Sequence, residues 1–124
     1  MPLVKFHLAD TVSDQLRDAV CAAVQEALIE TLDAPREDLF QIVTRHTVDE
    51  LKASEAWPGI VRRKQILYIE ILMVRMYDTA TKNRMYEAVA RRLEAEGVRP
   101  DDVFIAVTEN TLEDWYPGAR GMRG

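Results

Sequence analysis

The sequence predicts an α+β domain in which a β-α-β unit occurs twice, forming a four-stranded mixed sheet with two helices on one face. Two observations predict it: strand-like and helix-like apolar patterns alternate in the order β-α-β-loop-β-α-β, and the two halves share the register of those patterns. The chain has 124 residues, which suits a single domain over 1–124 with halves of roughly 1–60 and 61–124.

The first half begins with a strand and a long helix. Residues 3–8 alternate apolar and other side chains, as a strand with one buried face does. Apolar residues then recur at helical spacing over 12–32, which predicts an amphipathic helix. Asp10 or Thr11 offers an N-cap oxygen for this helix. Pro35 follows the helix, and a second strand is predicted at 40–44.

The second half repeats this order after a polar loop at 45–64. Residues 66–74 are nearly all apolar and rich in branched side chains, which predicts a central strand. A helix capped by Asp78 or Thr79 and stopped by Gly97 follows, and then a strand at 103–107.

The two halves match as copies of one unit. At an offset of 65 residues, three apolar helix positions and one proline of the first half match the second. The pairs are Val20 with Met85, Val24 with Val89, Leu28 with Leu93 and Pro35 with Pro100. At an offset of 64, Asp38 matches Asp102. A duplicated β-α-β unit explains this common register.

The repeat also predicts which residues meet at one end of the sheet. Strands within each unit are parallel, and a pseudo-twofold axis makes the strand at 3–8 antiparallel to the strand at 66–74. The start of the first strand then lies beside the end of the third and the start of the second. This brings Pro2, Arg75 and Asp38 together, with Asp102 at the opposite end.

One face of the predicted sheet has no helices to cover it. The strand at 66–74 is apolar on both faces apart from Glu70. A monomer would expose that surface to water, so we expect the chain to form an oligomer.

Charge and composition exclude several classes of function. The net charge is 16 − 21 = −5 and no basic face emerges, which argues against nucleic acid or an anionic membrane as partner. Cys21 is the only cysteine, and His7 and His46 are the only histidines, so we expect neither a disulfide framework nor a metal centre. We see no secretory signal and no run of 18 apolar residues, and we expect a cytoplasmic protein.

Short motifs occur along most of residues 1–116, at 1–6, 36–43, His46, 59–62, Lys82 with Tyr86, 102–105, Glu109-Asn110 and Asp114-Trp115. In this order and spacing they resemble the tautomerase superfamily, which is built from β-α-β units and uses an amino-terminal proline. Within it, the sequence is most similar to the malonate semialdehyde decarboxylase-like branch.

This resemblance implies a homotrimer with active sites near subunit boundaries. It also implies that Pro2 is the catalytic amine once Met1 is removed, that Asp38 is an activating carboxylate, and that Arg75 binds the substrate carboxylate. Tyr77 stands where the branch has a second arginine, and we expect it to line the pocket together with Trp115.

The carboxyl-terminal segment also departs from the branch. Residues 116–120 replace the family's usual segment after the tryptophan, and Arg120 within them is a candidate second cation for the pocket.

We therefore expect an enzyme without metal or organic cofactor that acts on a small carboxylate-bearing enol or keto acid. Tautomerase, decarboxylase and hydratase chemistry all remain open at this point. One alternative is a hydratase similar to cis-3-haloacrylate dehalogenases, and another is a non-catalytic trimeric binding or scaffold module of the same fold.

Overall fold

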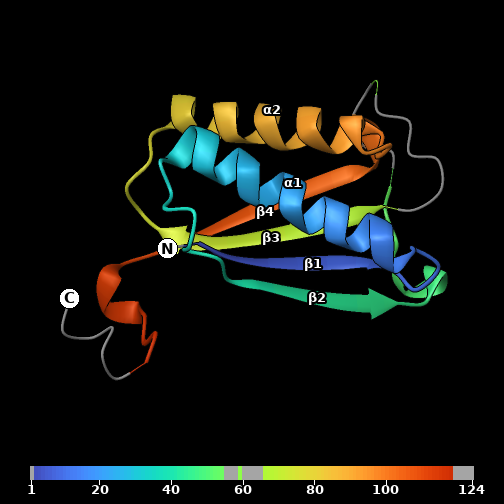
Figure 1. The fold of residues 1–124 in the computed structure, drawn as a ribbon, viewed down its shortest axis with the longest axis horizontal. Coiled ribbons are helices and arrows are strands. Elements are labelled where there is room, and N and C mark those ends of the chain that lie inside the picture. Colours follow the sequence, from blue (N-terminus) through green and yellow to red (C-terminus); the bar gives the residue numbers. More distant parts are fainter. Residues whose placement is uncertain (1, 55–58, 60–65, 119–124) are drawn as a thin grey trace.

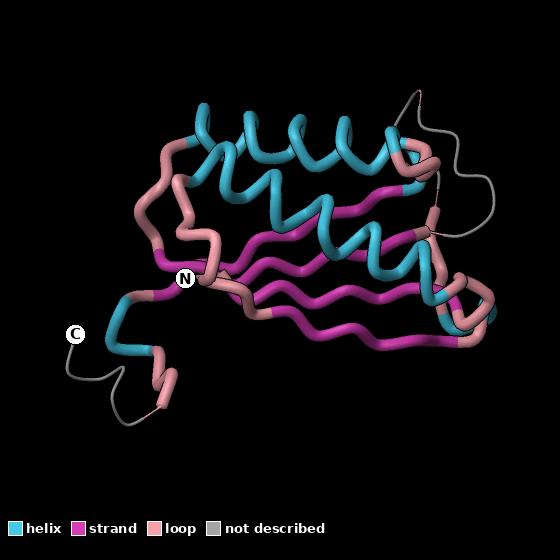
Figure 2. Tube along the Cα trace, viewed as in Figure 1, coloured by secondary structure: helices cyan, strands magenta, loops and turns pink. Residues whose placement is uncertain are grey.

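Two helices cover one face of a four-stranded sheet in the computed structural model, which describes residues 2–54, 59 and 66–118 (Figures 1 and 2). The helices and strands in chain order are β1 (Leu3–Ala9), α1 (Asp14–Leu32), β2 (Gln41–His46), β3 (Leu67–Val74), α2 (Thr79–Ala95) and β4 (Val103–Asn110). Single turns of 3-10 helix follow β2, precede β4 and follow β4, at Val48–Glu50, Pro100–Asp102 and Leu112–Asp114. The predicted α+β class is confirmed.

The strand order is β2-β1-β3-β4, as two β-α-β units joined edge to edge require. β1 runs parallel to β2, and β3 runs parallel to β4. β1 and β3 are antiparallel neighbours, with Leu3 opposite Leu72 and His7 opposite Tyr68. The predicted pairing of the two halves through their first strands is therefore confirmed.

The core lies between the sheet and the helix layer. Alternate residues of β1 and β3 point toward the helices, because successive side chains of a strand lie on opposite faces. Phe6 and Leu28 are fully buried there, as are Met85 and Leu93 of the second unit. Burial of these apolar side chains is the main term that stabilises the fold.

The ends of the helices differ in detail from the prediction. Ser13, rather than Asp10 or Thr11, caps α1, and its Oγ accepts a hydrogen bond of 3.0 Å from the Leu16 N–H. Asp78 caps α2 as expected, and its Oδ1 accepts a 2.8 Å hydrogen bond from the Thr81 N–H. Gly97 has a φ of 92°, a left-handed conformation that favours glycine, and it follows the end of α2 as predicted.

Two strands are longer than their apolar runs indicate. β2 continues to His46 and β4 continues to Asn110, since ladder pairing extends beyond the residues that face the core. The predicted loop contains a single turn of 3-10 helix, at Val48–Glu50. Residues 55–58 and 60–65, Arg62 among them, lie outside the described residues.

The sheet face away from the helices has a polar centre. Lys5 and Glu70 lie opposite each other there, and His7 Nε2 lies 2.5 Å from Glu70 Oε2. His7 Nδ1 lies 2.9 Å from His46 Nε2, so the two imidazoles share a hydrogen bond at the end of β2. Tyr68 and Leu72 are half-buried on the same face.

The described residues contain neither a membrane-spanning helix nor a metal-binding group. None of the helices in residues 2–54 and 66–118 is both long and apolar enough to cross a membrane. Within the same part of the chain, no three His, Cys, Asp or Glu side chains are grouped so that they could hold a metal ion.

Candidate active site

Pro2 lies at the end of the sheet where the two units meet. It is buried and directly precedes β1, a strand with a neighbour on both sides. Continuing the register by one residue places Pro2 opposite Met73 of β3, and continuing the other register by two places it beside Leu39, which precedes β2. Proline costs no ladder hydrogen bond at the first position of a strand, which makes it compatible with this place.

Arg75 lies at the same end, directly after β3. Its backbone N–H donates a 2.8 Å hydrogen bond to the carbonyl of Asn110, the last residue of β4. The Arg75 side chain is exposed. The anchored backbone therefore fixes the position from which the guanidinium reaches into solvent.

Trp115 is tied to the same asparagine. Its indole Nε1 donates to Asn110 Oδ1 at 2.7 Å, so Asn110 links Trp115 to the backbone of Arg75. The intervening turn is held by Asp114, whose Oδ2 accepts from the N–H and Oγ1 of Thr111 at 2.9 and 3.0 Å. This segment, orange to red in Figure 1, leaves the sheet at the end where the amino terminus lies.

Asp38 approaches this end from the other side, just before β2. A turn holds it, because the Asp38 N–H donates 3.0 Å to the carbonyl of Pro35. Gln25 of α1 donates through Nε2 to the Asp38 carbonyl at 3.4 Å. The half-buried Asp38 is thus positioned by its backbone. Its repeat counterpart Asp102 is positioned in the same way, since its N–H donates a 2.9 Å hydrogen bond to the Arg99 carbonyl.

Tyr77 lies under this end of the sheet and packs against the core. Its hydroxyl donates to the carbonyl of Leu32, the last residue of α1, at 3.4 Å. Burial raises the pKa of the Tyr77 phenol, and the negative charges of Asp38 and Asp33 raise it further. Tyr77 is therefore within electrostatic reach of Asp38.

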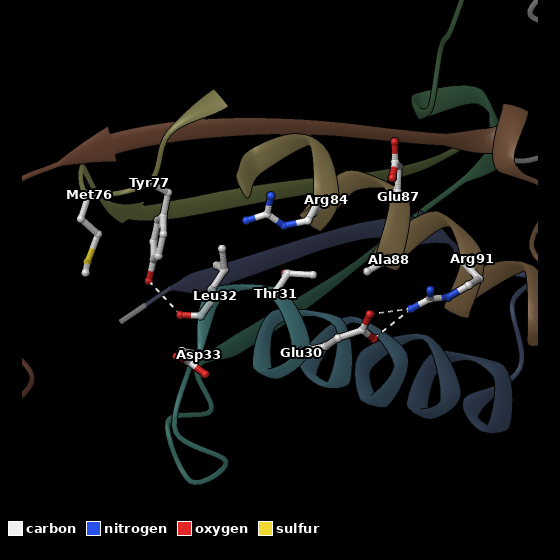
Figure 3. Close-up of a pocket in the computed structure, with 10 residues that line it drawn as sticks. All are labelled: Glu30, Thr31, Leu32, Asp33, Met76, Tyr77, Arg84, Glu87, Ala88 and Arg91. Atoms are coloured by element: carbon white, nitrogen blue, oxygen red, sulfur yellow. Dashed lines mark hydrogen bonds and ion pairs between the residues drawn. The ribbon is translucent and has the colours of Figure 1, made fainter. Parts of the chain in front are cut away.

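A cavity of about 680 Å³ opens on the helix side of Tyr77 (Figure 3). Its walls carry charges of both signs, including Arg84 and Arg91 of α2 and Glu30 of α1. Glu30 accepts from Arg91 at 2.8 and 2.9 Å, and hydrogen bonds from Arg91 and Arg92 lower the pKa of this carboxyl. Pro2, Asp38 and Arg75 do not line this cavity.

The structure thus brings Pro2, Asp38, Arg75 and Trp115 to one end of the sheet, with Tyr77 beneath them. Asp102 lies at the opposite end, at the start of β4, as predicted. Met1 and Arg120 lie outside the described residues. The link through Asn110 was not predicted from the sequence, which indicated Asn110 only as part of the motif Glu109-Asn110.

The comparisons with known proteins agree with this architecture. A family model described as "Tautomerase enzyme" matches residues 38–116, which is more than half of the chain. The chain belongs to the tautomerase family.

A curated relative supports the same assignment along nearly the whole chain. The probable tautomerase YusQ of Bacillus subtilis is 29% identical over 119 residues, covering 95% of this chain and 94% of the relative.

Two solved structures share both the fold and detectable sequence identity with this chain. The FG41 malonate semialdehyde decarboxylase, solved with the inhibitor 3-bromopropiolate, is 35% identical with a TM-score of 0.91, covering 94% of this chain and 88% of that one. A second malonate semialdehyde decarboxylase, solved as wild type, as a proline-to-alanine mutant and inactivated, is 26% identical with a TM-score of 0.88, covering 94% and 90%. That second structure is described as a basis for decarboxylase and hydratase activities.

The position of Tyr77 predicts an unusual phenol titration. Because folding raises the Tyr77 pKa, its neutral form stabilises the fold below the ordinary phenol pKa, and this contribution is lost as pH rises through the folded value. The difference in tyrosinate absorbance between the wild type and Tyr77→Phe, followed against pH, reports the titration of Tyr77. Its midpoint should lie at higher pH in the folded proteins than in the same proteins unfolded in urea. Equal midpoints in the folded and unfolded proteins would contradict the burial of this ring.

Proposed function

We propose that this tautomerase-family chain is a cofactor-independent enzyme that moves a proton on a small carboxylate-bearing enol or keto acid. The proton carrier is the Pro2 amine, freed by removal of Met1. One observation carries the proposal: the buried Pro2 directly precedes a central strand, at the sheet end that Arg75 and Asp38 share.

The surroundings of Pro2 favour a neutral amine. Burial disfavours a charged ammonium, and the positive charge of Arg75 at the same sheet end acts in the same direction. A neutral secondary amine near physiological pH is a general base. It takes a proton from one end of an enol or from a carbon beside a carbonyl, and returns it at the other end of the conjugated system.

Arg75 holds the substrate by its carboxylate. A planar guanidinium makes two parallel hydrogen bonds to a carboxylate, which fixes the distance and orientation of the reacting carbons. Asp38 orients the amine or a water molecule from the β2 side, and Tyr77 and Trp115 line the pocket. Where the resemblance implies a second arginine, this chain has Tyr77, whose hydroxyl donates to the Leu32 carbonyl, so binding depends mainly on one cation.

Decarboxylation of a β-keto acid is the second candidate, and the 35% identity to a malonate semialdehyde decarboxylase favours it. In this reaction Pro2 is protonated and polarises the ketone. The C–C bond to the carboxylate breaks, carbon dioxide leaves, and the resulting enolate takes a proton. The haloacrylate hydratase alternative fits less well, since we expect it to need two cations on the carboxylate.

We also propose that the chain works as a homotrimer with the site near subunit boundaries. Large apolar side chains are exposed around the Pro2 end and along the β2 edge, where a single chain leaves them in water. They include Leu39 at 53%, Phe40 at 43%, Ile42 at 48% and Met76 at 68% exposure. A partner copy would cover them and close the site.

Replacing Pro2 with alanine should lower kcat/KM by about 10²-fold or more on substrates of the wild-type enzyme, because general acid–base catalysis contributes 10²–10⁴-fold. The assay compares an aryl enol acid, a hydroxymuconate-type enol and a β-keto acid, after intact-mass analysis has established whether Met1 is absent. Pro100→Ala is the matched control, because it makes the same substitution at the turn equivalent to that of Pro35. It should keep wild-type rates. Equal rates for Pro2→Ala and wild type on every substrate would favour the non-catalytic module.

Replacing Arg75 with alanine should raise KM at least tenfold for a carboxylate substrate, since one charge-assisted bidentate contact is lost. Arg75→Lys should recover part of this loss through its charge alone. Arg84→Ala is the matched control, because Arg84 lines the cavity of Figure 3. The opposite pattern, with Arg84 essential and Arg75 dispensable, would move the site to that cavity.

Sedimentation of the purified protein should give a mass about three times the 14.2 kDa of one chain. Ile42→Glu should lower that mass by placing a charge on the exposed β2 edge. Val48→Glu is the control at an equally exposed valine outside the sheet and should leave the mass unchanged. A single-chain mass for the wild type at micromolar concentration would contradict the trimer.

A further inference from the structure

The two ends of the sheet are related by the repeat, but they carry different side chains. At an offset of 65, the helix caps Ser13 and Asp78 occupy equivalent places, so the residues just before them, Val12 and Tyr77, are equivalent too. Both of those residues pack against the core. The two ends therefore carry a tyrosine and a valine at equivalent positions.

At the Pro2 end, the ring of Tyr77 occupies the space beneath the sheet. It packs against the core and reaches the end of α1, where its hydroxyl meets the Leu32 carbonyl (Figure 3). At the opposite end, the much smaller Val12 stands at the equivalent position and carries no ring. A cavity of about 340 Å³ lies beside Val12.

This cavity is largely apolar. Val12, Leu16 and Val20 of the first unit face it, together with Leu67 and Val98 of the second. Its volume is within the range of about 300–1,000 Å³ usual for small-molecule sites. Apolar cavities of only about 150 Å³ already bind a benzene ring. The space therefore admits a whole aromatic molecule.

The polar groups at the cavity favour an uncharged ligand. Asp102 lines it at 8% exposure, and its Oδ2 accepts from Arg99 Nη1 at 3.3 Å. A second carboxylate, Asp101, lies 3.8 Å from Arg99 Nη2. The rim groups offer hydrogen bonds, while the apolar walls penalise a ligand with a net charge, because burial of an unpaired charge is costly.

The reactive groups of the Pro2 end have no counterparts here. Leu67 stands at the position equivalent to Pro2, and Asp10 stands at the position equivalent to Arg75. An internal residue has an amide nitrogen rather than an amine, and Asp10 cannot hold a carboxylate. The cavity can therefore bind a molecule but lacks the proton-transfer groups proposed for the other end.

We propose that this cavity is a second binding site, specific for a small uncharged aromatic molecule of the phenol class. Its ring lies where Tyr77 lies in the other unit, and its hydroxyl meets the polar rim formed by Arg99 and Asp102. This site goes beyond the proposed reaction and does not depend on it.

The test is a titration of the full-length protein with phenol and 4-methylphenol, followed by heteronuclear NMR and calorimetry. Saturable binding is expected, with the largest shifts in the methyl groups of Leu16 and Val98. Val12→Tyr supplies the missing ring covalently and should weaken binding at least tenfold. Val48→Tyr, at an exposed valine, is the matched control and should bind as the wild type does.

Further comparisons keep the proposal falsifiable. Val98→Phe fills the cavity from the opposite wall and should also weaken binding tenfold, which covers the case that Val12→Tyr fails to fold. Benzoate should bind at least tenfold more weakly than phenol. Pro2→Ala should leave phenol binding unchanged even if it abolishes catalysis. The proposal is overturned by non-saturable binding to wild type, by wild-type affinity in a folded cavity-filling variant, by equal affinity for benzoate, or by loss of phenol binding in Pro2→Ala.

Discussion

The antiparallel pairing of β1 with β3 is the contact on which the arrangement of the whole molecule depends. Each β-α-β unit could form its own parallel pair, but the ladder from Leu3–Leu72 to His7–Tyr68 joins the two units into one sheet. Because the paired strands run in opposite directions, the start of the chain meets the end of β3. Pro2 and Arg75, far apart in sequence, come to one sheet end for this reason alone.

The sequence predicts this topology well because it depends on patterns longer than any single contact. The repeat of Val20, Val24 and Leu28 in the second helix fixes the order of elements, and the right-handed crossover of β-α-β units leaves few ways to join them. The start of α1 was predicted less well. Asp10 or Thr11 was the expected cap, but in the folded backbone Ser13 accepts the bond.

The contacts at the candidate site could not be predicted from the sequence, since they depend on which side chain fills which space. The sequence places Tyr77 after the third strand but does not show that its hydroxyl reaches the end of α1. It likewise gives Asn110 and Trp115 a spacing of five without revealing their 2.7 Å hydrogen bond. The cavity beside Val12 likewise depends on side chains of both units, Leu16 and Val98 among them, which the sequence alone does not bring together.

The duplication also explains why the two ends of the sheet differ in chemistry. A second copy of the unit can reproduce the helix, the cap and the turn carboxylate, as Asp78 and Asp102 illustrate. It cannot reproduce a chain terminus, because Leu67, the equivalent of Pro2, is an internal residue whose nitrogen belongs to a peptide bond. The proposed Pro2 amine, which requires removal of Met1, therefore has no counterpart at the opposite end of the sheet. That end instead carries the largely apolar cavity beside Val12.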